Sequence, residues 1–246
     1  MQAVWEDQYR INSYDCGFNK EAKLHSLLNH FQESAQNHAT HLGFGFEDLE
    51  SAGQLWVLSR LHMVIHSLPH WGDFIMVTTW PKIPESPFAF RDFEIRGLNN
   101  SILLSGTTSW LILDYHTRRP TRDIQTLRDA IDYPIGKHAI KEPAPRLPAL
   151  KDRELVSSLT AGFSDIDPNG HVNHAIYLAW ITDLLPASYH QQYMAGEVSL
   201  NFLAEVKMGD TIDIFANHSE QEWNFEATRK QDGTVAFRAR FLSGKR

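Results

Sequence analysis

The residues best suited to chemistry lie in one short stretch, at positions 163–180. Asp165, Asp167, Asn169 and His171 alternate there, in a segment that also holds a proline and a glycine. An almost wholly apolar run follows directly, so these side chains precede a predicted buried helix. A histidine can accept a proton near neutral pH, and an Asn amide can donate to a developing oxyanion. The pattern predicts a site for chemistry that uses water.

The same residue types also begin helices, which is the alternative interpretation. Asp and Asn side chains accept hydrogen bonds from the first helical amides and so act as N-caps. Each residue taken alone fits a cap better, whereas the whole alternating set favours a catalytic site. We expect the helix amides just after His171 to point free N–H groups toward the site, with Asp165 or Asp167 orienting His171 or these amides.

Apolar periodicity divides the chain into two similar halves. The first half predicts an amphipathic helix over 20–42 and strands over 55–67, 73–80, 88–96 and 101–115. The second half predicts a helix over 172–185 and strands over 197–205, 211–217, 222–230 and 234–242. Residues 131–152 are rich in proline and show no period, so they are interpreted as a linker.

Local sequence echoes favour two copies of one unit. Trp71-Gly72-Asp73 precedes a strand in the first half, as Met208-Gly209-Asp210 does in the second. The second helix has almost no polar face and must therefore be enclosed. A sheet wrapped around a central helix satisfies this requirement. The predicted fold is α+β, with tandem hot-dog repeats at 1–130 and 153–246.

Composition limits the class of protein. The chain has 246 residues, of which 42% are hydrophobic, enough for one large domain or two of about 120 residues. A formal charge of -7 argues against general nucleic-acid binding. Cys16 is the only cysteine, so no internal disulfide can form and a reducing cytoplasm is the expected compartment. No apolar run approaches the roughly 20 residues that span a membrane, so no membrane association is expected.

The segment from Asp165 to Trp180 resembles the active-site motif of the acyl-acyl carrier protein thioesterases, a plant-type family also found in bacteria. That motif reads Asp-x-Asp-x-Asn-x-His-Val-Asn-Asn-x-x-Tyr-x-x-Trp. Supporting matches lie at 56–60, 69–73, 107–110 and 117–119. The resemblance implies a double hot-dog fold and hydrolysis of the thioester between a fatty acyl chain and its carrier, which ends fatty-acid synthesis. It also implies acyl carrier protein as the partner. No cofactor or metal is expected.

The resemblance also assigns site residues. The implied catalytic set is Asp167, Asn169, His171 and Glu205, and the implied substrate-binding set is Trp56, Arg60, Asn173 and Tyr177. The family often has a cysteine directly after the catalytic Glu, whereas this chain has Val206, and its second motif Asn is His174. Because no Gly-x-Ser-x-Gly elbow occurs either, direct attack by water is the favoured hypothesis. Glu205 and His171 would take its proton, Asn169 and a helix amide would hold the thioester oxygen, and Asp167 would fix the geometry.

Other features carry weaker expectations. Residues 115–153 hold nine Lys or Arg against five Asp or Glu, which suits docking of an acidic carrier, although a solvated linker explains it equally well. The docking candidates are Arg118, Arg119, Arg122, Lys137, Lys141 and Arg146. Thirteen histidines invite a metal reading, but His38 and His41 are expected on a solvated helix surface. Trp56, Trp80 and Trp110 fit either an acyl pocket in the first repeat or plain strand core.

Two other functions stay open. One is an acyl-CoA thioesterase of the same fold, and the other is a non-catalytic acyl-binding or dehydratase-like hot-dog protein. The joint presence of Asn169, His171 and Glu205 weighs against the second. Chain-length preference and the choice between monomer and homodimer are left undetermined by the sequence.

Overall fold

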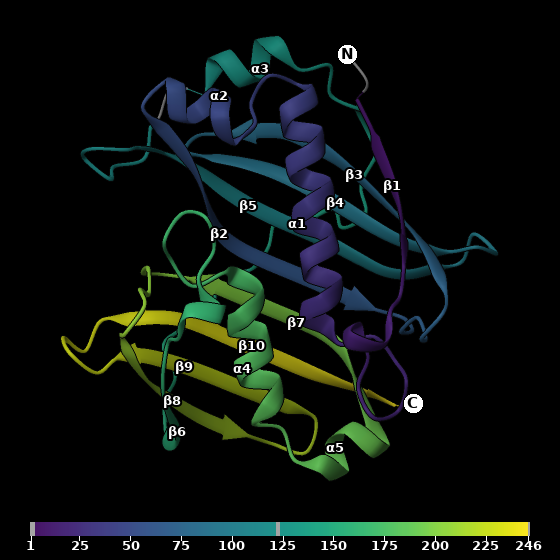
Figure 1. Cartoon of the computed structure of the whole chain (residues 1–246), viewed down its shortest axis with the longest axis vertical. Helices are drawn as coiled ribbons and strands as arrows, with labels where there is room; N and C mark the ends of the chain where they lie inside the picture. Colours follow the sequence, from purple (N-terminus) through teal and green to yellow (C-terminus); the bar gives the residue numbers. More distant parts are fainter. Residues whose placement is uncertain (1–2, 122–123, 246) are drawn as a thin grey trace. The chain divides into compact units, whose positions relative to one another are not determined.

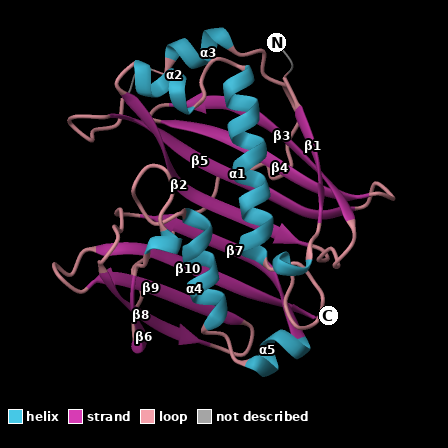
Figure 2. Cartoon of the chain, viewed as in Figure 1, coloured by secondary structure: helices cyan, strands magenta, loops and turns pink. Residues whose placement is uncertain are grey.

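The chain folds into two compact units, residues 1–144 and 145–246. A computed structural model describes residues 3–121 and 124–245 (Figure 1). Each unit is an antiparallel sheet with a helix on one face (Figure 2). Among the described residues, no helix is long and apolar enough to cross a membrane.

The N-terminal unit has five strands in the order β1-β3-β4-β5-β2, all neighbours antiparallel. The strands are β1 (Trp5–Arg10), β2 (Gln54–Ile65), β3 (Phe74–Glu85), β4 (Phe88–Gly97) and β5 (Ile102–Asp114). The helices are α1 (Leu24–His41), α2 (Phe46–Ser51) and α3 (Gln125–Ala130), with a short 3-10 turn at Ser13–Asp15.

Helix α1 packs through its apolar face onto this sheet. Leu24, Leu27, Leu28 and Phe31 are all buried, at the spacing that places side chains on one face of a helix. The Phe31 ring stacks on Phe93 of β4, with ring centroids 4.3 Å apart. The neighbouring position on β5 is Gly106, where a Cβ atom would lie 2.7 Å from the Phe31 ring. The close approach of α1 to the sheet therefore requires a glycine there.

The C-terminal unit repeats the plan, with strands in the order β7-β10-β9-β8-β6. Its strands are β6 (Glu154–Thr160), β7 (Tyr193–Phe202), β8 (Thr211–His218), β9 (Glu222–Arg229) and β10 (Val235–Lys245). Its helices are α4 (His174–Asp183) and α5 (Ala187–Gln192), with a 3-10 turn at Phe163–Asp165. Two hot-dog units in tandem confirm the predicted fold class.

The structure corrects one expectation about α4. Ala175, Tyr177, Leu178 and Ile181 are buried against the sheet, as the apolar sequence predicts. The opposite side is not fully enclosed, because residues such as Trp180 are only half-buried. The expectation that the whole helix is enclosed is therefore wrong.

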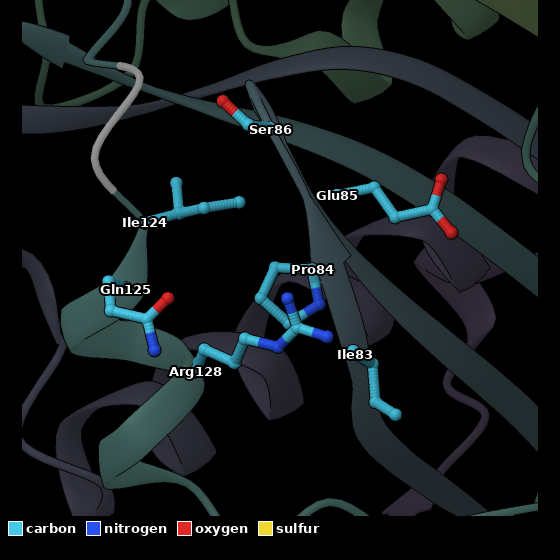
Figure 3. Close-up of a pocket in the computed structure, with 7 residues that line it drawn as sticks. All are labelled: Ile83, Pro84, Glu85, Ser86, Ile124, Gln125 and Arg128. Atoms are coloured by element: carbon cyan, nitrogen blue, oxygen red, sulfur yellow. The ribbon is translucent and has the colours of Figure 1, made fainter.

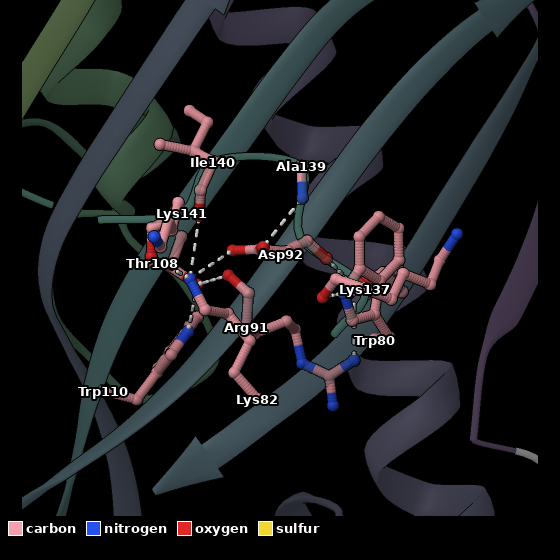
Figure 4. A network of polar contacts seen from close by, with 11 residues as sticks. Trp80, Lys82, Arg91, Asp92, Thr108, Trp110, Lys137, Ala139, Ile140 and Lys141 are labelled. Carbon is pink, nitrogen blue, oxygen red and sulfur yellow. Dashed lines mark hydrogen bonds and ion pairs between the residues drawn. The ribbon is translucent and has the colours of Figure 1, made fainter. Parts of the chain in front are cut away.

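Residues 131–152, expected as a linker, pack against the units on both sides of the boundary. In the N-terminal unit the Lys82 ammonium lies 3.3 Å from Asp92 and donates to the Ile140 carbonyl at 2.8 Å (Figure 4). The Ala139 amide donates to the same Asp92 carboxylate at 2.9 Å. In the C-terminal unit the buried Glu226 accepts from the Leu150 amide at 3.2 Å. Buried carboxylates thus hold this irregular segment against each sheet.

Candidate active site

The loop before α4 is a tight hairpin that closes between Asp167 and His171. The Asp167 amide donates to the His171 carbonyl at 2.8 Å, and the Gly170 amide donates back to the Asp167 carbonyl at 2.9 Å. Gly170 has a φ of +77°, the left-handed conformation that glycine adopts without strain. Pro168, Asn169 and Gly170 thus form a three-residue turn of the kind that ends with a left-handed residue. The turn fixes Asp167 and His171 side by side.

His171 meets Glu205 directly. The His171 Nε2 atom lies 3.1 Å from Glu205 Oε2, and their side chains are 20% and 33% exposed. Glu205, the predicted catalytic residue that lies outside the hairpin, is therefore in contact with His171 on it. Because a carboxylate only accepts hydrogen bonds, a neutral His171 in this contact carries its proton on Nε2. Its Nδ1 then has the lone pair that a general base requires.

Three contacts hold Glu205 at this place. The Val172 amide donates to the Val206 carbonyl at 2.8 Å, which ties the segment after Glu205 to the hairpin. Arg229 on β9 donates to the Glu205 carbonyl at 2.9 Å. The buried Tyr177 of α4 makes a backbone hydrogen bond with Val206. Arg229 was missed by sequence reasoning, because nothing in its strand distinguishes it from a surface arginine.

Asp167 holds Asn169. The Asn169 amide donates to Asp167 Oδ1 at 2.8 Å, and the Asn169 side-chain nitrogen lies 3.4 Å from Oδ2. Asn169 is exposed at the tip of the turn, so its second side-chain N–H can reach a substrate. The second aspartate, Asp165, is a cap: its carboxylate accepts from the Gly162 amide at 2.7 Å.

The expectation that the amides just after His171 are free is wrong. The Val172 amide donates to Val206, the Asn173 amide donates to the Asp165 carbonyl at 2.8 Å, and the Ala175 amide donates to the Asn173 side chain at 2.8 Å. All three amides therefore donate to acceptors within the protein. The Ala175 amide does so because Asn173 is the N-cap of α4. None of the three can donate to a substrate oxygen in this arrangement.

The four predicted substrate-binding residues occupy different environments. Asn173 caps α4, and Tyr177 packs its ring 5.0 Å from Phe237 in the core. Burial raises the Tyr177 pKa well above its usual range, so the phenol stays neutral. Both residues position the hairpin and the Glu205 segment.

Trp56 and Arg60 are not brought together. A register shift between Leu58 and Arg60 inserts an extra residue in β2 and places the two side chains on opposite faces of the sheet. The Trp56 indole donates to the Phe44 carbonyl at 2.9 Å, on the side covered by the helices. The Arg60 guanidinium lies over the Phe88 ring, 5.1 Å from its centre.

The carrier-docking candidates divide between the two units. Arg119, Lys141 and Arg146 are exposed, Arg118 is half-buried, and Arg122 lies outside the described residues. Lys137 is also exposed, and its ammonium lies 4.2 Å from the centre of the Trp80 ring. Arg119 and Lys141 in the N-terminal unit and Arg146 in the C-terminal unit keep their charge available.

One expectation for the first repeat is wrong. His38 is fully buried rather than solvated, and its ring stacks on Trp5 with centroids 5.8 Å apart. Trp80, expected either in an acyl pocket or in the strand core, is fully buried on the face of the sheet that carries Asp92, which favours the strand core. Within the described part of the chain, no group of three His, Cys, Asp or Glu side chains could hold a metal ion.

A pocket of about 310 Å³ lies between α3 and the turn after β3 (Figure 3). Ile83, Pro84, Ile124 and Arg128 line it, and Figure 3 shows the Glu85 carboxylate pointing away. None of the predicted catalytic residues lines this pocket, so it adds nothing to their chemistry.

The hairpin recurs in the N-terminal unit with different side chains. There the Gly17 amide donates to the Glu21 carbonyl at 2.9 Å, and Lys20 takes the left-handed position with a φ of 65°. The Ala22 amide donates to the Pro69 carbonyl at 2.8 Å, as Val172 does to Val206. By this equivalence Glu21 stands where His171 does, and the residue before Pro69, Leu68, stands where Glu205 does. Of the two hairpins, the C-terminal one carries the acid–base pair.

Two hot-dog units, one with a histidine–glutamate pair at the start of its helix, define a double hot-dog protein with one candidate active site. Residues 2–131 match the acyl-ACP thioesterase N-terminal domain, and residues 149–240 match the C-terminal domain. The chain belongs to the acyl-ACP thioesterase family.

Known proteins and structures agree with this assignment. A chloroplastic palmitoyl-acyl carrier protein thioesterase of Arabidopsis thaliana is 28% identical over an alignment of 214 residues, and the match covers 82% of this chain and 52% of that protein. The chain thus spans about half the length of the curated relatives it matches. An acyl-ACP thioesterase from Bacteroides thetaiotaomicron, known from a crystal structure, is 27% identical in sequence. Its structure superposes over 98% of this chain and 98% of that one, with a TM-score of 0.87. The 12:0-ACP thioesterase of Umbellularia californica, 24% identical, shares the fold with a TM-score of 0.88 over 100% of this chain and 99% of that one.

Proposed function

We propose that the protein hydrolyses the thioester of acyl-acyl carrier protein and releases free fatty acid. The contact between His171 and Glu205 carries the proposal, because it supplies an oriented base within the motif that the family shares. Asp167 and Asn169 on the same hairpin complete the catalytic set.

Water is the proposed nucleophile. The only thiol, Cys16, lies in the other unit, where its Sγ–H donates to the Asn12 carbonyl at 3.4 Å. Burial raises its pKa, which disfavours the thiolate that a nucleophile requires. Val206 stands beside Glu205 and offers no nucleophilic atom.

The proposed reaction moves one proton onto the protein and returns it. Nδ1 of His171 takes a proton as the water oxygen bonds to the thioester carbon, while Glu205 stabilises the imidazolium through Nε2. The carbonyl oxygen becomes negative and accepts from the Asn169 side-chain amide. The C–S bond then breaks, and the leaving sulfur takes the proton from His171. The products are a fatty acid and the thiol of the carrier.

One assay tests the function. Purified protein is given matched acyl-carrier and acyl-CoA thioesters over a range of chain lengths, and free fatty acid release is measured. A higher kcat/KM on carrier thioesters supports the proposal. A higher value on CoA thioesters would instead indicate an acyl-CoA thioesterase, and no release from either would indicate a non-catalytic acyl-binding protein.

A further inference from the structure

An arginine at the end of β9 joins the Glu205 segment to the turn between β9 and β10, residues 230–234. The Nη1 atom of Arg229 donates to the Glu205 carbonyl at 2.9 Å. The other side of the guanidinium meets the Asp232 carboxylate, with Nη2 2.7 Å from Oδ2 and Nε 3.4 Å from Oδ1. Because the donors of a guanidinium lie in one rigid plane, the contact with Asp232 sets the direction in which Nη1 points.

The turn in its place holds Asp232. The Asp232 carboxylate accepts from the Thr234 amide at 3.0 Å. Hydrogen bonds from this amide and from Arg229 lower the Asp232 pKa, so the carboxylate stays ionised at neutral pH. The Gly233 amide donates to the Arg229 carbonyl at 2.8 Å, which ties the turn to the end of β9. Arg229 and Asp232 are therefore held by the same turn.

The segment that Arg229 contacts is irregular. Residues 203–210 connect β7 to β8 and lie outside both strands. Beyond Glu205 the segment is tied to the catalytic hairpin, because the Val206 carbonyl accepts from the Val172 amide at 2.8 Å. Arg229 adds a hydrogen bond at the carbonyl of Glu205 itself. Since this carbonyl and the Glu205 side chain share one Cα atom, fixing the peptide restricts where the carboxylate can point.

The N-terminal unit has a glycine at the position equivalent to Arg229. Ile75 pairs with Gly97 in the ladder of β3 and β4, and Ile212 pairs with Arg229 in the ladder of β8 and β9. The two isoleucines are equivalent, because each stands two residues after the aspartate of a Gly-Asp pair that precedes the strand. Gly97 therefore occupies the position of Arg229.

The turn itself is the same in both units. The Gly97 amide donates to the Ser101 carbonyl at 3.0 Å, and the Ser101 amide donates to the Asn99 side chain at 3.1 Å. Both hydrogen bonds have counterparts in the β9–β10 turn, at 2.9 and 3.0 Å. The turn therefore forms without an arginine. Since the unit with the glycine also has Leu68 in place of Glu205, the arginine accompanies the acid–base pair and not the turn.

We propose that Arg229, fixed by Asp232, is a positioning residue that keeps the Glu205 carboxylate in contact with His171. The proposal rests on the function proposed above. Arg229 acts through the Glu205 backbone, so the chemistry of the pair stays with His171 and Glu205. Without Arg229 the Glu205 peptide can rotate, and the 3.1 Å contact between Nε2 and Oε2 is then formed for less of the time. A displacement of about 1 Å in a catalytic group can cost about 100-fold in rate.

Steady-state kinetics on one acyl-carrier thioester gives the first test. Arg229→Met should lower kcat by about 10- to 100-fold with little change in KM, because the guanidinium contacts Glu205 and Asp232. Arg229→Lys should recover only part of this loss, since one ammonium cannot reproduce the fork that holds both partners. Lys230→Met, which removes an exposed cation from the same turn, is the matched control and should keep the wild-type kcat.

Nitrogen-15 NMR of His171 tests the contact without any substrate. At a pH at which the imidazole is neutral, wild type should carry its proton on Nε2 alone, because Glu205 accepts there. Arg229→Met should show both tautomers, as should Glu205→Ala, which removes the acceptor. Lys230→Met should show the wild-type tautomer.

The tautomer separates positioning from a merely structural role. A folded Arg229→Met variant with the proton on Nε2 alone would overturn the proposal, even if its kcat or thermal midpoint fell. If Arg229→Met does not fold, Asp232→Asn gives the decision, because it keeps an oxygen for the Thr234 amide and removes only the charge that fixes Arg229. It should show both tautomers and a several-fold lower kcat, whereas wild-type behaviour in both measurements would overturn the proposal. Failure of wild type to hydrolyse any carrier thioester would refute the enzymatic function alone, since the tautomer is measured in the free protein.

Discussion

The Nε2 atom of His171 lies 3.1 Å from Oε2 of Glu205, and this contact decides which imidazole nitrogen can act as base. With Nε2 donating to the carboxylate, Nδ1 is left with the lone pair. Glu205 is itself held through the backbone, by Arg229 at its carbonyl and by the pairing of Val206 with Val172. Backbone contacts therefore position the pair, and they leave the reacting side-chain atoms of His171 and Glu205 unchanged.

Glu205→Gln should lower kcat by about 100- to 10,000-fold with little change in KM. The Gln amide can still contact Nε2, but it is neutral and can no longer stabilise an imidazolium. Steady-state kinetics on one acyl-carrier thioester measures the effect. Glu220→Gln, an exposed carboxylate before β9, should keep wild-type kinetics. Equal activity of the Glu205 and Glu220 variants would show that Glu205 is not part of the machinery.

His171→Ala combined with Glu205→Gln should be scarcely slower than His171→Ala alone. Residues that act as one unit lose their effect together, so the two losses should not add. The measurement is kcat for both single variants and the double variant, with circular dichroism to confirm folding. Losses that multiply would mean that the two groups act independently, against the contact seen here.

The hairpin shows how far the sequence could predict this site. The alternate spacing predicted Asp167, Asn169 and His171 in one loop-like segment, and the structure has them on one turn. The family resemblance named Glu205, which contacts His171. The free amides were predicted wrongly, because the partners of Val172 and Asn173 come from residues distant in sequence. The role of Arg229 could not be predicted from the sequence, because a hydrogen bond to a backbone carbonyl requires no particular residue type at a fixed spacing.

The fold shows a similar division. Long periodic segments such as α1 and β5 were predicted well, whereas β1 and β6 were missed. Both are edge strands with one neighbour each, so half or more of their side chains meet solvent and their apolar signal is weak. The buried position of His38 follows from its tertiary partners, Trp5 and Arg91, which no helical period reveals.

Asp167→Asn should lower kcat by about tenfold or more while leaving the fold intact. The substituted side chain keeps an oxygen for the Asn169 backbone amide, but its NH2 group would face the Asn169 side-chain nitrogen, two donors in contact. The Asn169 amide would then turn from its position. Kinetics together with the thermal midpoint checks this, and unchanged kcat would remove Asp167 from the catalytic set.

Reversing exposed basic charges should weaken carrier recognition only. Arg119→Glu, Lys141→Glu and Arg146→Glu should each raise KM for acyl-carrier thioesters several-fold at low salt, because an acidic partner loses electrostatic steering. Small thioesters without the carrier should be hydrolysed as by wild type. Arg10→Glu is the matched reversal, away from residues 115–153. Equal losses on both kinds of substrate would contradict a docking role for these residues.

His174 should make the folded state sensitive to acid. Burial lowers its pKa to about 4, against about 6.5 in the unfolded chain. The unfolded state therefore binds more protons between these values, so this stabilising contribution is fully present above about pH 6.5 and is lost as the pH falls toward 4. Between pH 7 and pH 5, protonation of His174 in the unfolded chain should lower the free energy of unfolding by about 1 to 2 kcal/mol.

Urea unfolding of wild type and His174→Asn at both pH values measures this contribution. The Asn side chain does not titrate, so the variant should lose less stability on acidification, whatever its stability at pH 7. His66→Asn, which removes an exposed histidine after β2, should keep the wild-type pH dependence. If the free energy of unfolding fell equally for His174→Asn and wild type between pH 7 and pH 5, His174 would have the same pKa in the folded and unfolded states. Its burial at the start of α4 would then have no effect on its protonation.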